Sequence, residues 1–185
     1  MCSSQTMHGA GFLMAQPKTI PYEDAILAIQ AKKHWPKGVF FDWKSSSAKR
    51  FPAPYSFRTS LAIDDAQTKF AEDWFVELYY KKSSVPGVRD TISITFIVNR
   101  SRVVAVDDNG HGSHLNKVGV GLPHYQRTVD FPHLHIPVPE SSYGYAEPLS
   151  STTVQELWGL FLAKANIGGA PRIELPESGQ MGLNV

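Results

Sequence analysis

The sequence predicts an α+β fold: a mainly antiparallel, curved sheet of five or six strands, with an N-terminal helix and a C-terminal helix packed on it. Three observations lead to this prediction. Several runs of aromatic and β-branched residues have the composition of strands. Two of these runs are separated by only the four residues NRSR at 99–102, which indicates an antiparallel hairpin. Near the C-terminus, apolar residues recur with helical spacing instead.

The N-terminal helix is expected over residues 19–33, TIPYEDAILAIQAKK. Pro21 suits the first turn, because the fixed φ of proline matches a helix start. Acidic residues near the start and basic residues near the end complement the helix dipole: Glu23, Asp24, Lys32 and Lys33. The side expected to be buried carries Tyr22, Ile26 and Ile29.

The strands are expected at 38–44, 54–63, 73–80, 91–98, 103–107 and 131–138. In the third run, every second residue is a large apolar one, so one face should carry Trp74, Val76, Leu78 and Tyr80. The last two runs are joined by residues 108–130, which contain several Gly and His residues. Loops of this length in compact domains are usually functional or disordered, so we expect the chemistry here.

The C-terminal helix is expected behind a Ser/Thr cap cluster at 150–153. Its apolar residues recur at i, i+3, i+4, i+7 and i+8 and are expected to be buried against the sheet: Val154, Leu157, Trp158, Phe161 and Leu162. The residues IGGAP end the helix, and the short segment RIEL follows. We expect a flexible arm over 1–17, a single domain over 18–178 and a flexible tail over 179–185.

Composition limits the classes of function. The chain has 18 Lys and Arg residues against 17 Asp and Glu residues, so it lacks the basic excess typical of proteins that coat long duplex DNA. Cys2 is the only cysteine, which excludes an internal disulfide and any thiolate-rich metal site. No apolar run approaches the roughly 18 residues of a membrane span, and the N-terminal residues lack the pattern of a signal peptide. We therefore expect a cytoplasmic protein without membrane contact.

Histidines are concentrated in one part of the chain. Five of the seven lie within 25 residues: His111, His114, His124, His133 and His135. His133 and His135 are two residues apart in an expected strand, so both should point to one face, and His114 should reach that face from the preceding loop. Three imidazoles can bind a divalent metal such as zinc, manganese or iron and leave a position open for water. Asp130 or Glu140 could add an oxygen ligand.

Two other interpretations of these histidines remain open. Two imidazoles could serve as base and acid in RNA cleavage through the 2′-hydroxyl, without any metal. Alternatively, His133 and His135 are half-buried strand residues that make structural hydrogen bonds. Other catalytic signals are missing, since there is no phosphate-binding Gly loop with lysine, no GxSxG elbow and no cysteine placed for nucleophilic catalysis.

Aromatic residues in the runs VFFDW and WFVELYY could stack nucleic-acid bases, although such stripes more often form a core. Basic residues beside the expected sheet could form a rim, or could simply be solvated: Lys44, Lys49, Arg50, Arg58, Lys81 and Lys82.

The segments VVAVDDNGHGSHLN, PHLHI, YGYAEPL and ANIGGAPRIEL resemble an uncharacterised family of small bacterial and mobile-element proteins. Its members read D-x-N-G-x-x-H-x-N, then H-L-H-I, then G-Y-G-x-x-W-A-x-P-L. The resemblance covers residues 90–176, with one extra residue before His114 and a longer segment ahead of His133. The matching positions are Asp107, Asn109, Gly110, His114, Asn116, His133, His135, Tyr143, Gly144 and Pro148.

We expect His114, His133 and His135 to be the catalytic residues, and Asn109, Asn116 and Tyr143 to be binding residues. We expect the two asparagines to brace the loop by capping backbone groups. The layout is similar to that of TumE-type toxins, which implies a toxin-like or host-interfering protein that acts on RNA or a nucleotide and has an antitoxin-like partner. Two alternatives stay open. One is a non-catalytic phage or mobile-element inhibitor that binds a host defence protein or a nucleoprotein complex, and the other is a metal-dependent small-molecule enzyme that uses the same histidines.

Overall fold

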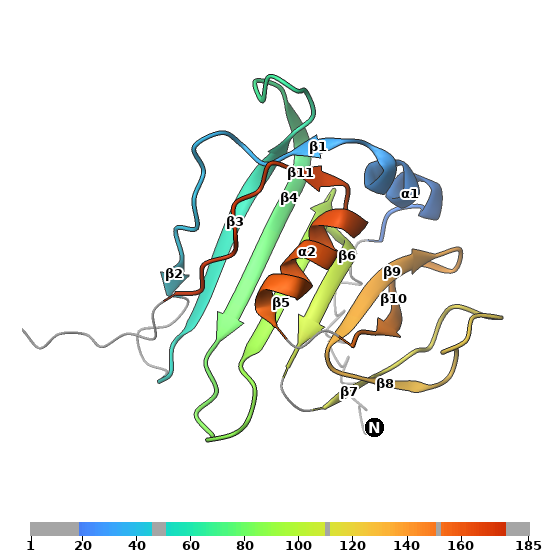
Figure 1. Ribbon diagram of the computed structural model, residues 1–185. Coiled ribbons are helices and arrows are strands. Elements are labelled where there is room, and N and C mark those ends of the chain that lie inside the picture. The colour runs from blue at the N-terminus through green and yellow to red at the C-terminus, as the bar shows by residue number, and fades with distance from the viewer. Residues whose placement is uncertain (1–18, 46–50, 110–111, 151–152, 177–185) are drawn as a thin grey trace, which may run out of the picture.

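The computed structural model describes residues 19–45, 51–109, 112–150 and 153–176 (Figure 1). The predicted arm and tail lie outside the described residues, as do Lys49, Arg50, Gly110 and His111. The elements in chain order are α1 (Tyr22–Gln30), β1 (Lys33–His34), β2 (Lys44–Ser45), β3 (Pro54–Ala62), β4 (Phe70–Lys81), β5 (Thr91–Val98), β6 (Ser101–Asp108), β7 (Ser113–Leu115), β8 (Thr128–Asp130), β9 (His133–Val138), β10 (Ser141–Pro148), α2 (Val154–Lys164) and β11 (Ile167–Gly168).

The predicted α+β class is confirmed, but the sheet has more strands than expected. Nine strands form one sheet in the order β10-β9-β6-β5-β4-β3-β1-β11, with β2 paired to β3. Its pairs are antiparallel except for the parallel pair β1–β11. β7 and β8 form a separate two-stranded sheet. Neither helix in the described residues has the length or apolar character that a membrane crossing requires.

Most strand predictions are confirmed by the pairing of these segments in the sheet. The segment 91–98 is β5, and the hairpin with β6 turns at Asn99 and Arg100, both with positive φ. In β4, Val76, Leu78 and Tyr80 are buried on one face, as expected.

The predicted strand over 38–44 is wrong, because only its last residue, Lys44, lies in a strand. Gly38 has a φ of +75°, and the amide of Val39 donates to the carbonyl of Pro36, so the chain turns here. Phe41 and Trp43 instead pack as an irregular segment against Phe57. Their aromatic composition therefore reflects burial rather than extended structure.

The predicted helix over 19–33 is shorter than expected. α1 ends at Gln30, because Ala31 is extended, with a ψ of 130°, and Lys33 enters β1. Its fully buried residues are Ala25 and Ala28, whereas the predicted stripe of Tyr22, Ile26 and Ile29 is only half-buried. Lys33 does cap the helix end, since its Nζ donates to the carbonyls of Ala28 and Ala31 at 2.5 and 2.6 Å.

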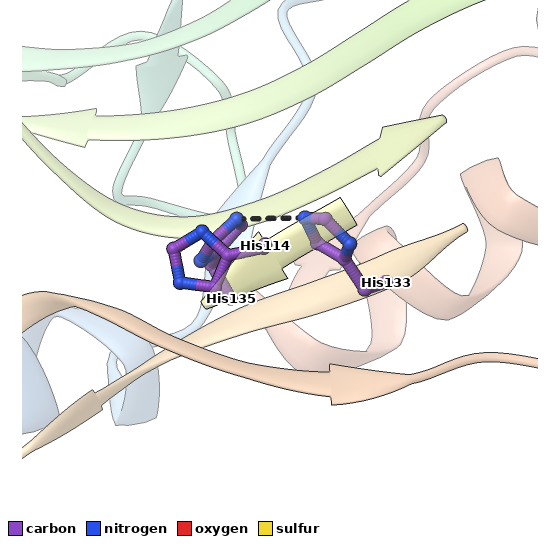
Figure 2. Close-up of side chains that lie close together, drawn as sticks. All are labelled: His114, His133 and His135. Atoms are coloured by element: carbon purple, nitrogen blue, oxygen red, sulfur yellow. Dashed lines mark hydrogen bonds between the residues drawn. The ribbon is translucent and has the colours of Figure 1, made fainter. Parts of the chain in front are cut away.

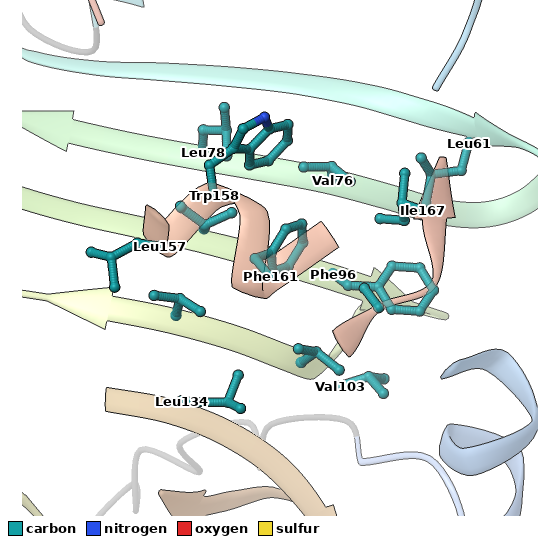
Figure 3. Close-up of a cluster of buried hydrophobic side chains, with 14 of the residues drawn as sticks. Leu61, Val76, Leu78, Phe96, Val103, Leu134, Leu157, Trp158, Phe161 and Ile167 are labelled. Carbon is teal, nitrogen blue, oxygen red and sulfur yellow. The ribbon is translucent and has the colours of Figure 1, made fainter. Parts of the chain in front are cut away.

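The main core lies between the sheet and the helices (Figure 3). α2 crosses one face of the sheet (Figure 1) and buries Leu157, Trp158 and Phe161, while Val154 and Leu162 are half-buried. Thr153 begins α2 with the capping box that its Ser/Thr cluster predicts, because its side chain accepts from Glu156 N while Glu156 reaches back. α1 adds its two alanines to the same cluster.

The opposite face of the sheet is polar, and we call it the polar face. Direct cross-strand partners form a row across it: Lys44, Ser56, Tyr79, Ser93, Asp107 and His133. A second row, two residues along each strand, contains Arg58, Glu77, Thr95, Ala105 and His135. Because side chains alternate between faces, these rows point away from the core under α2.

Candidate metal centre

β9 carries two of the three candidate histidines. It lies between β6 and β10, with His133 beside Asp107 and His135 beside Ala105. The side chains of His133 and His135 share the polar face and are only 1% and 2% exposed. The predicted strand starts at His133 rather than at Phe131, and its two-residue alternation holds.

His114 of β7 completes the cluster. Its ring centroid lies 5.6 Å from that of His133 and 4.7 Å from that of His135. One ring nitrogen from each of the three histidines lies within 4.8 Å of the other two (Figure 2). The prediction that His114 reaches the face of His133 and His135 is therefore confirmed.

A buried asparagine holds the β7–β8 hairpin against the edge strand β10. Asn116 is 0% exposed, and its Nδ2 donates to Ala146 O at 2.9 Å and to His124 O at 3.0 Å. Its Oδ1 accepts from Ala146 N at 2.7 Å. This is the predicted bracing of backbone groups. Asn109 differs, because its Oδ1 accepts from the hydroxyl of Thr91 at 2.9 Å.

In each imidazole, one nitrogen faces an oxygen acceptor. His114 Nε2 lies 2.9 Å from Gly144 O, and His133 Nδ1 lies 3.3 Å from Asp130 O. His135 Nε2 lies 3.3 Å from Asp107 Oδ2 and 3.0 Å from His133 Nε2. Donation to those oxygens leaves a lone pair on His114 Nδ1, His133 Nε2 and His135 Nδ1. His135 Nδ1 is buried and has no hydrogen-bond partner among the described residues.

Asp107 links the cluster to a cationic side chain. Arg102 Nη2 lies 3.1 and 3.2 Å from the two Asp107 oxygens, and the Ser93 hydroxyl donates to Oδ1 at 2.5 Å. Burial raises the pKa of Asp107, but the hydrogen bond with His135, the Arg102 charge and Ser93 together hold it well below its ordinary value. Asp107 is therefore ionised and orients His135.

Burial also lowers the pKa values of the two histidines of β9. Together with repulsion from His135, it lowers the pKa of His133 from 6.5 to about 4, although Asp107 acts in the opposite direction. Burial lowers the pKa of His135 as well, by more than its hydrogen bond with Asp107 raises it. Both imidazoles are therefore neutral at pH 7, which is the form that binds metals.

The chain matches no known protein family, curated protein or solved structure. The function of the protein therefore has to be inferred from the chemistry of this site. The resemblance to an uncharacterised family, and the similarity of its layout to that of TumE-type toxins, stay predictions.

Aromatic rings enclose the cluster on two sides. The Phe131 ring stacks on His133 with centroids 4.3 Å apart, and the Tyr143 ring lies 4.5 Å from that of His135. The Arg102 guanidinium lies over the Tyr143 ring, 4.6 Å from its centroid. Burial raises the pKa of Tyr143 to about 12, so its phenol is protonated at neutral pH. The structure thus brings Tyr143 to the site.

Asp130 and Glu140, which were expected to add an oxygen ligand, do not belong to the cluster. Glu140 accepts from the amide of Val120, and Asp130 offers its backbone carbonyl to His133. Asp107 supplies the carboxylate, and neither it nor Arg102 was expected to act there. Three charged residues at the two ends of the apolar strand SRVVAVDD, Arg102, Asp107 and Asp108, were the available signal.

Proposed function

We propose that the protein is a hydrolytic enzyme that uses a divalent transition metal bound by His114, His133 and His135. The observation that supports this best is the hydrogen-bond pattern of the three rings, in which each has one nitrogen facing an oxygen and a lone pair on the other. Metal-binding histidines have this arrangement, because the outer hydrogen bond fixes the tautomer and the ring orientation. The Asp107–His135 pair is a carboxylate–histidine unit of the same kind.

The distances support the same conclusion. Nitrogens bound to one tetrahedral zinc at about 2.05 Å lie roughly 3.3 Å apart. One ring nitrogen from each histidine lies within 4.8 Å of the other two, which is within small side-chain movements of that value. Three protein ligands are typical of catalytic rather than structural zinc, and such a metal acts as a Lewis acid on a bound water.

Acid–base cleavage without a metal has less support. A general acid must carry a proton at the working pH, whereas His133 and His135 both have lowered pKa values and are neutral at pH 7. A host-binding inhibitor would not need these two buried side chains, so their arrangement gives it no support. The toxin-like and inhibitor functions stay predictions from the sequence.

Metal analysis of the full-length protein tests the proposal. After loading with zinc and desalting, we expect about one zinc per chain in the wild type. His135→Gln should lose more affinity than the roughly 10–100-fold typical of losing a residue that only hydrogen-bonds a metal ligand. His124→Gln is the matched control, since this histidine lies outside the cluster. Zinc-dependent hydrolysis of bis(4-nitrophenyl) phosphate should likewise be lower in His135→Gln than in the wild type and in His124→Gln.

Two results would contradict the proposal. One is a wild type that binds zinc no better than His135→Gln while both are folded by circular dichroism. The other is equal loss of zinc in His135→Gln and His124→Gln, which would place the binding elsewhere.

A further inference from the structure

A cleft of about 590 Å³ lies on the polar face, and its lining reaches Ser93 and Arg102, which contact Asp107 beside the histidine cluster. Its lining includes the polar face residues Ser56, Arg58, Glu77, Tyr79, Ser93 and Thr95, together with Asp42, Lys44 and Arg102. This volume is in the range of small-molecule and cofactor sites. The cleft therefore offers room for a substrate on the side of the sheet away from α2.

Three lining residues connect the cleft to the histidines. Arg102 Nη2 lies 3.2 Å from Ser93 Oγ and 3.1 Å from Thr95 Oγ1, besides its contacts to Asp107. Asp107 in turn holds His135. Arg102 Nε is buried and has no hydrogen-bond partner among the described residues. The Arg102 side chain as a whole is 36% exposed, so its guanidinium, which lines the cleft, can approach a phosphate oxygen there.

The polar face is long enough for an extended ligand. The row from Lys44 to His133 crosses strands β2, β3, β4, β5, β6 and β9. Five strand spacings of roughly 4.8 Å give a length of about 24 Å. A single nucleotide would fill only part of this row, whereas a strand of several nucleotides would follow it to the cluster.

The side chains along the row suit a single-stranded nucleic acid. Tyr79 is 37% exposed, which leaves a ring face for a base. The Arg58 guanidinium lies 3.8 Å from the Phe75 centroid and pairs with Glu77 at 2.7 Å. Lys44 at the far end and Arg102 near the cluster can each neutralise a phosphate.

The hydroxyl side chains of the cleft offer partners for a ribose, with Ser93 already donating to Asp107 and Thr95 only 5% exposed. Hydroxyl groups of Ser56, Ser93 and Thr95 lie along the two rows of the polar face. A ribose 2′-hydroxyl can both donate to and accept from such groups, and it is the group by which proteins distinguish RNA from DNA.

We infer that the polar face binds single-stranded RNA, with bases on Tyr79, backbone phosphates at Lys44 and Arg102, and the scissile phosphate presented to the histidine cluster. As a statement about the substrate this rests on the proposed function, but binding itself needs no metal. In the reaction, the oxygen of water bonds to phosphorus and the bond from phosphorus to the leaving oxygen breaks. One proton of the water passes to that leaving oxygen, so no further reactant is needed.

Fluorescence anisotropy with 5′-fluorescein-labelled octauridylate and metal-free full-length protein tests the inference. Tyr79→Ala should weaken binding about 5- to 150-fold, the effect of losing one stacked base. Tyr22→Ala is the matched control, because this tyrosine belongs to α1. Circular dichroism checks that both variants are folded.

Salt dependence provides a second, independent readout. Two phosphate contacts predict a slope near −1.4 in a plot of log affinity against log salt, and Lys44→Ala should reduce its magnitude by about 0.7. Lys164→Ala, which removes a cation from the last turn of α2, should leave the slope unchanged.

Several outcomes would overturn the inference. These are no binding of octauridylate, equal loss in Tyr79→Ala and Tyr22→Ala, equal affinity for octathymidylate, or equal affinity for uridine 5′-monophosphate. RNA binding by a protein that takes up no zinc would overturn the proposed enzyme but leave this inference standing. Zinc uptake without RNA binding would overturn this inference and leave the proposed enzyme standing.

Discussion

At the scale of single residues, burial determines the charge of His133. Its imidazole is 1% exposed, and its pKa falls from 6.5 to about 4. The folded state therefore binds this proton only at a lower pH than the unfolded chain does. Acidification consequently favours the unfolded chain through this group.

We predict that the metal-free protein loses stability as the pH falls from about 6.5 towards 4. Between these values the unfolded state binds more protons, so His133 lowers the free energy of unfolding by up to about 1.4 kcal/mol per pH unit. Urea unfolding with a chelator present, at a series of pH values, measures this slope. The pH slope of His133→Gln should be smaller than that of the wild type over the same range, and equal slopes would contradict the prediction.

Asn116 and Asn109 were expected to act alike, but their surroundings differ. We predict that Asn116→Ala lowers the free energy of unfolding by about 2–4 kcal/mol, because two backbone groups of Ala146 lose their partner and each such loss costs about 1–3 kcal/mol. The exposed Asn109 bonds one hydroxyl, so Asn109→Ala should cost less than about 1 kcal/mol. Urea unfolding compares them, and similar losses would show that Asn116 does not hold the hairpin.

The residues of the cluster were predictable to different degrees. His133 and His135 follow from two-residue alternation within one strand, which is a local pattern. Asp107 and Arg102 act through cross-strand register, and Asp107 meets His133 only because β6 pairs with β9. No local pattern in a single sequence states that register, so their roles became visible only in the fold.

At the scale of elements, two glycines of the β7–β8 connection allow the effect of backbone strain to be distinguished from the effect of a steric contact. Gly119 and Gly121 have similar φ values, +89° and +83°. A Cβ on Gly119 would lie 2.5 Å from the Tyr145 ring, whereas one on Gly121 meets nothing within 4 Å. The close packing of Gly119 on Tyr145 therefore sets how near this connection lies to β10.

We predict that Gly121→Ala costs about 1–2 kcal/mol through backbone strain alone, and that Gly119→Ala costs about 1–3 kcal/mol more through overpacking. Only Gly119→Ala should also increase amide hydrogen exchange in β7 and β8, because it displaces the hairpin. Urea unfolding and hydrogen exchange test both points. Equal behaviour of the two variants would mean that the contact with Tyr145 is unimportant.

For α2, the heptad-like spacing in the sequence was sufficient. We predict that Trp158→Ala lowers the free energy of unfolding by about 3–5 kcal/mol, since its side chain is 1% exposed. Leu160 on the same helix is 44% exposed, so Leu160→Ala should cost less than about 1 kcal/mol. Urea denaturation measures both, and a small loss for Trp158→Ala would show that the helix is not docked.

The aromatic run at 38–44 shows where composition misleads. Strand propensity and core burial favour the same large side chains. Phe41 and Trp43 are half-buried and pack against the core without joining a ladder. Strand β10 was missed for the opposite reason, since Gly144 and Pro148 disfavour a strand by composition.

At the scale of the whole molecule, the class of fold was predictable from the sequence, but the pairing of β1 with β11 was not. Alternation and helical spacing identify the sheet and the helices. The parallel pair of β1 and β11 joins segments more than a hundred residues apart through two residues each. Strands this short carry no periodicity that a sequence could reveal.

The whole molecule should also respond to a metal at the histidine cluster. We predict that zinc at 100 times its dissociation constant raises the free energy of unfolding by about 2.7 kcal/mol, which corresponds to roughly 5–10 °C in Tm for a chain of this size. Differential scanning calorimetry with zinc, and then with excess chelator, measures the shift and its reversal. His135→Gln should show no shift, and an equal shift in that variant would contradict the site.

The hydrogen bonds of Asn116 to Ala146 also bear on self-association. β10 is the last strand on its side of the sheet, and an uncovered strand of that kind can pair with a strand of another molecule and start aggregation. Here the outward amide and carbonyl of Ala146 are occupied by a side chain, and the carbonyl of Gly144 faces His114. The hairpin that delivers a histidine to the cluster thus also covers part of the edge at which β10 could pair with another molecule.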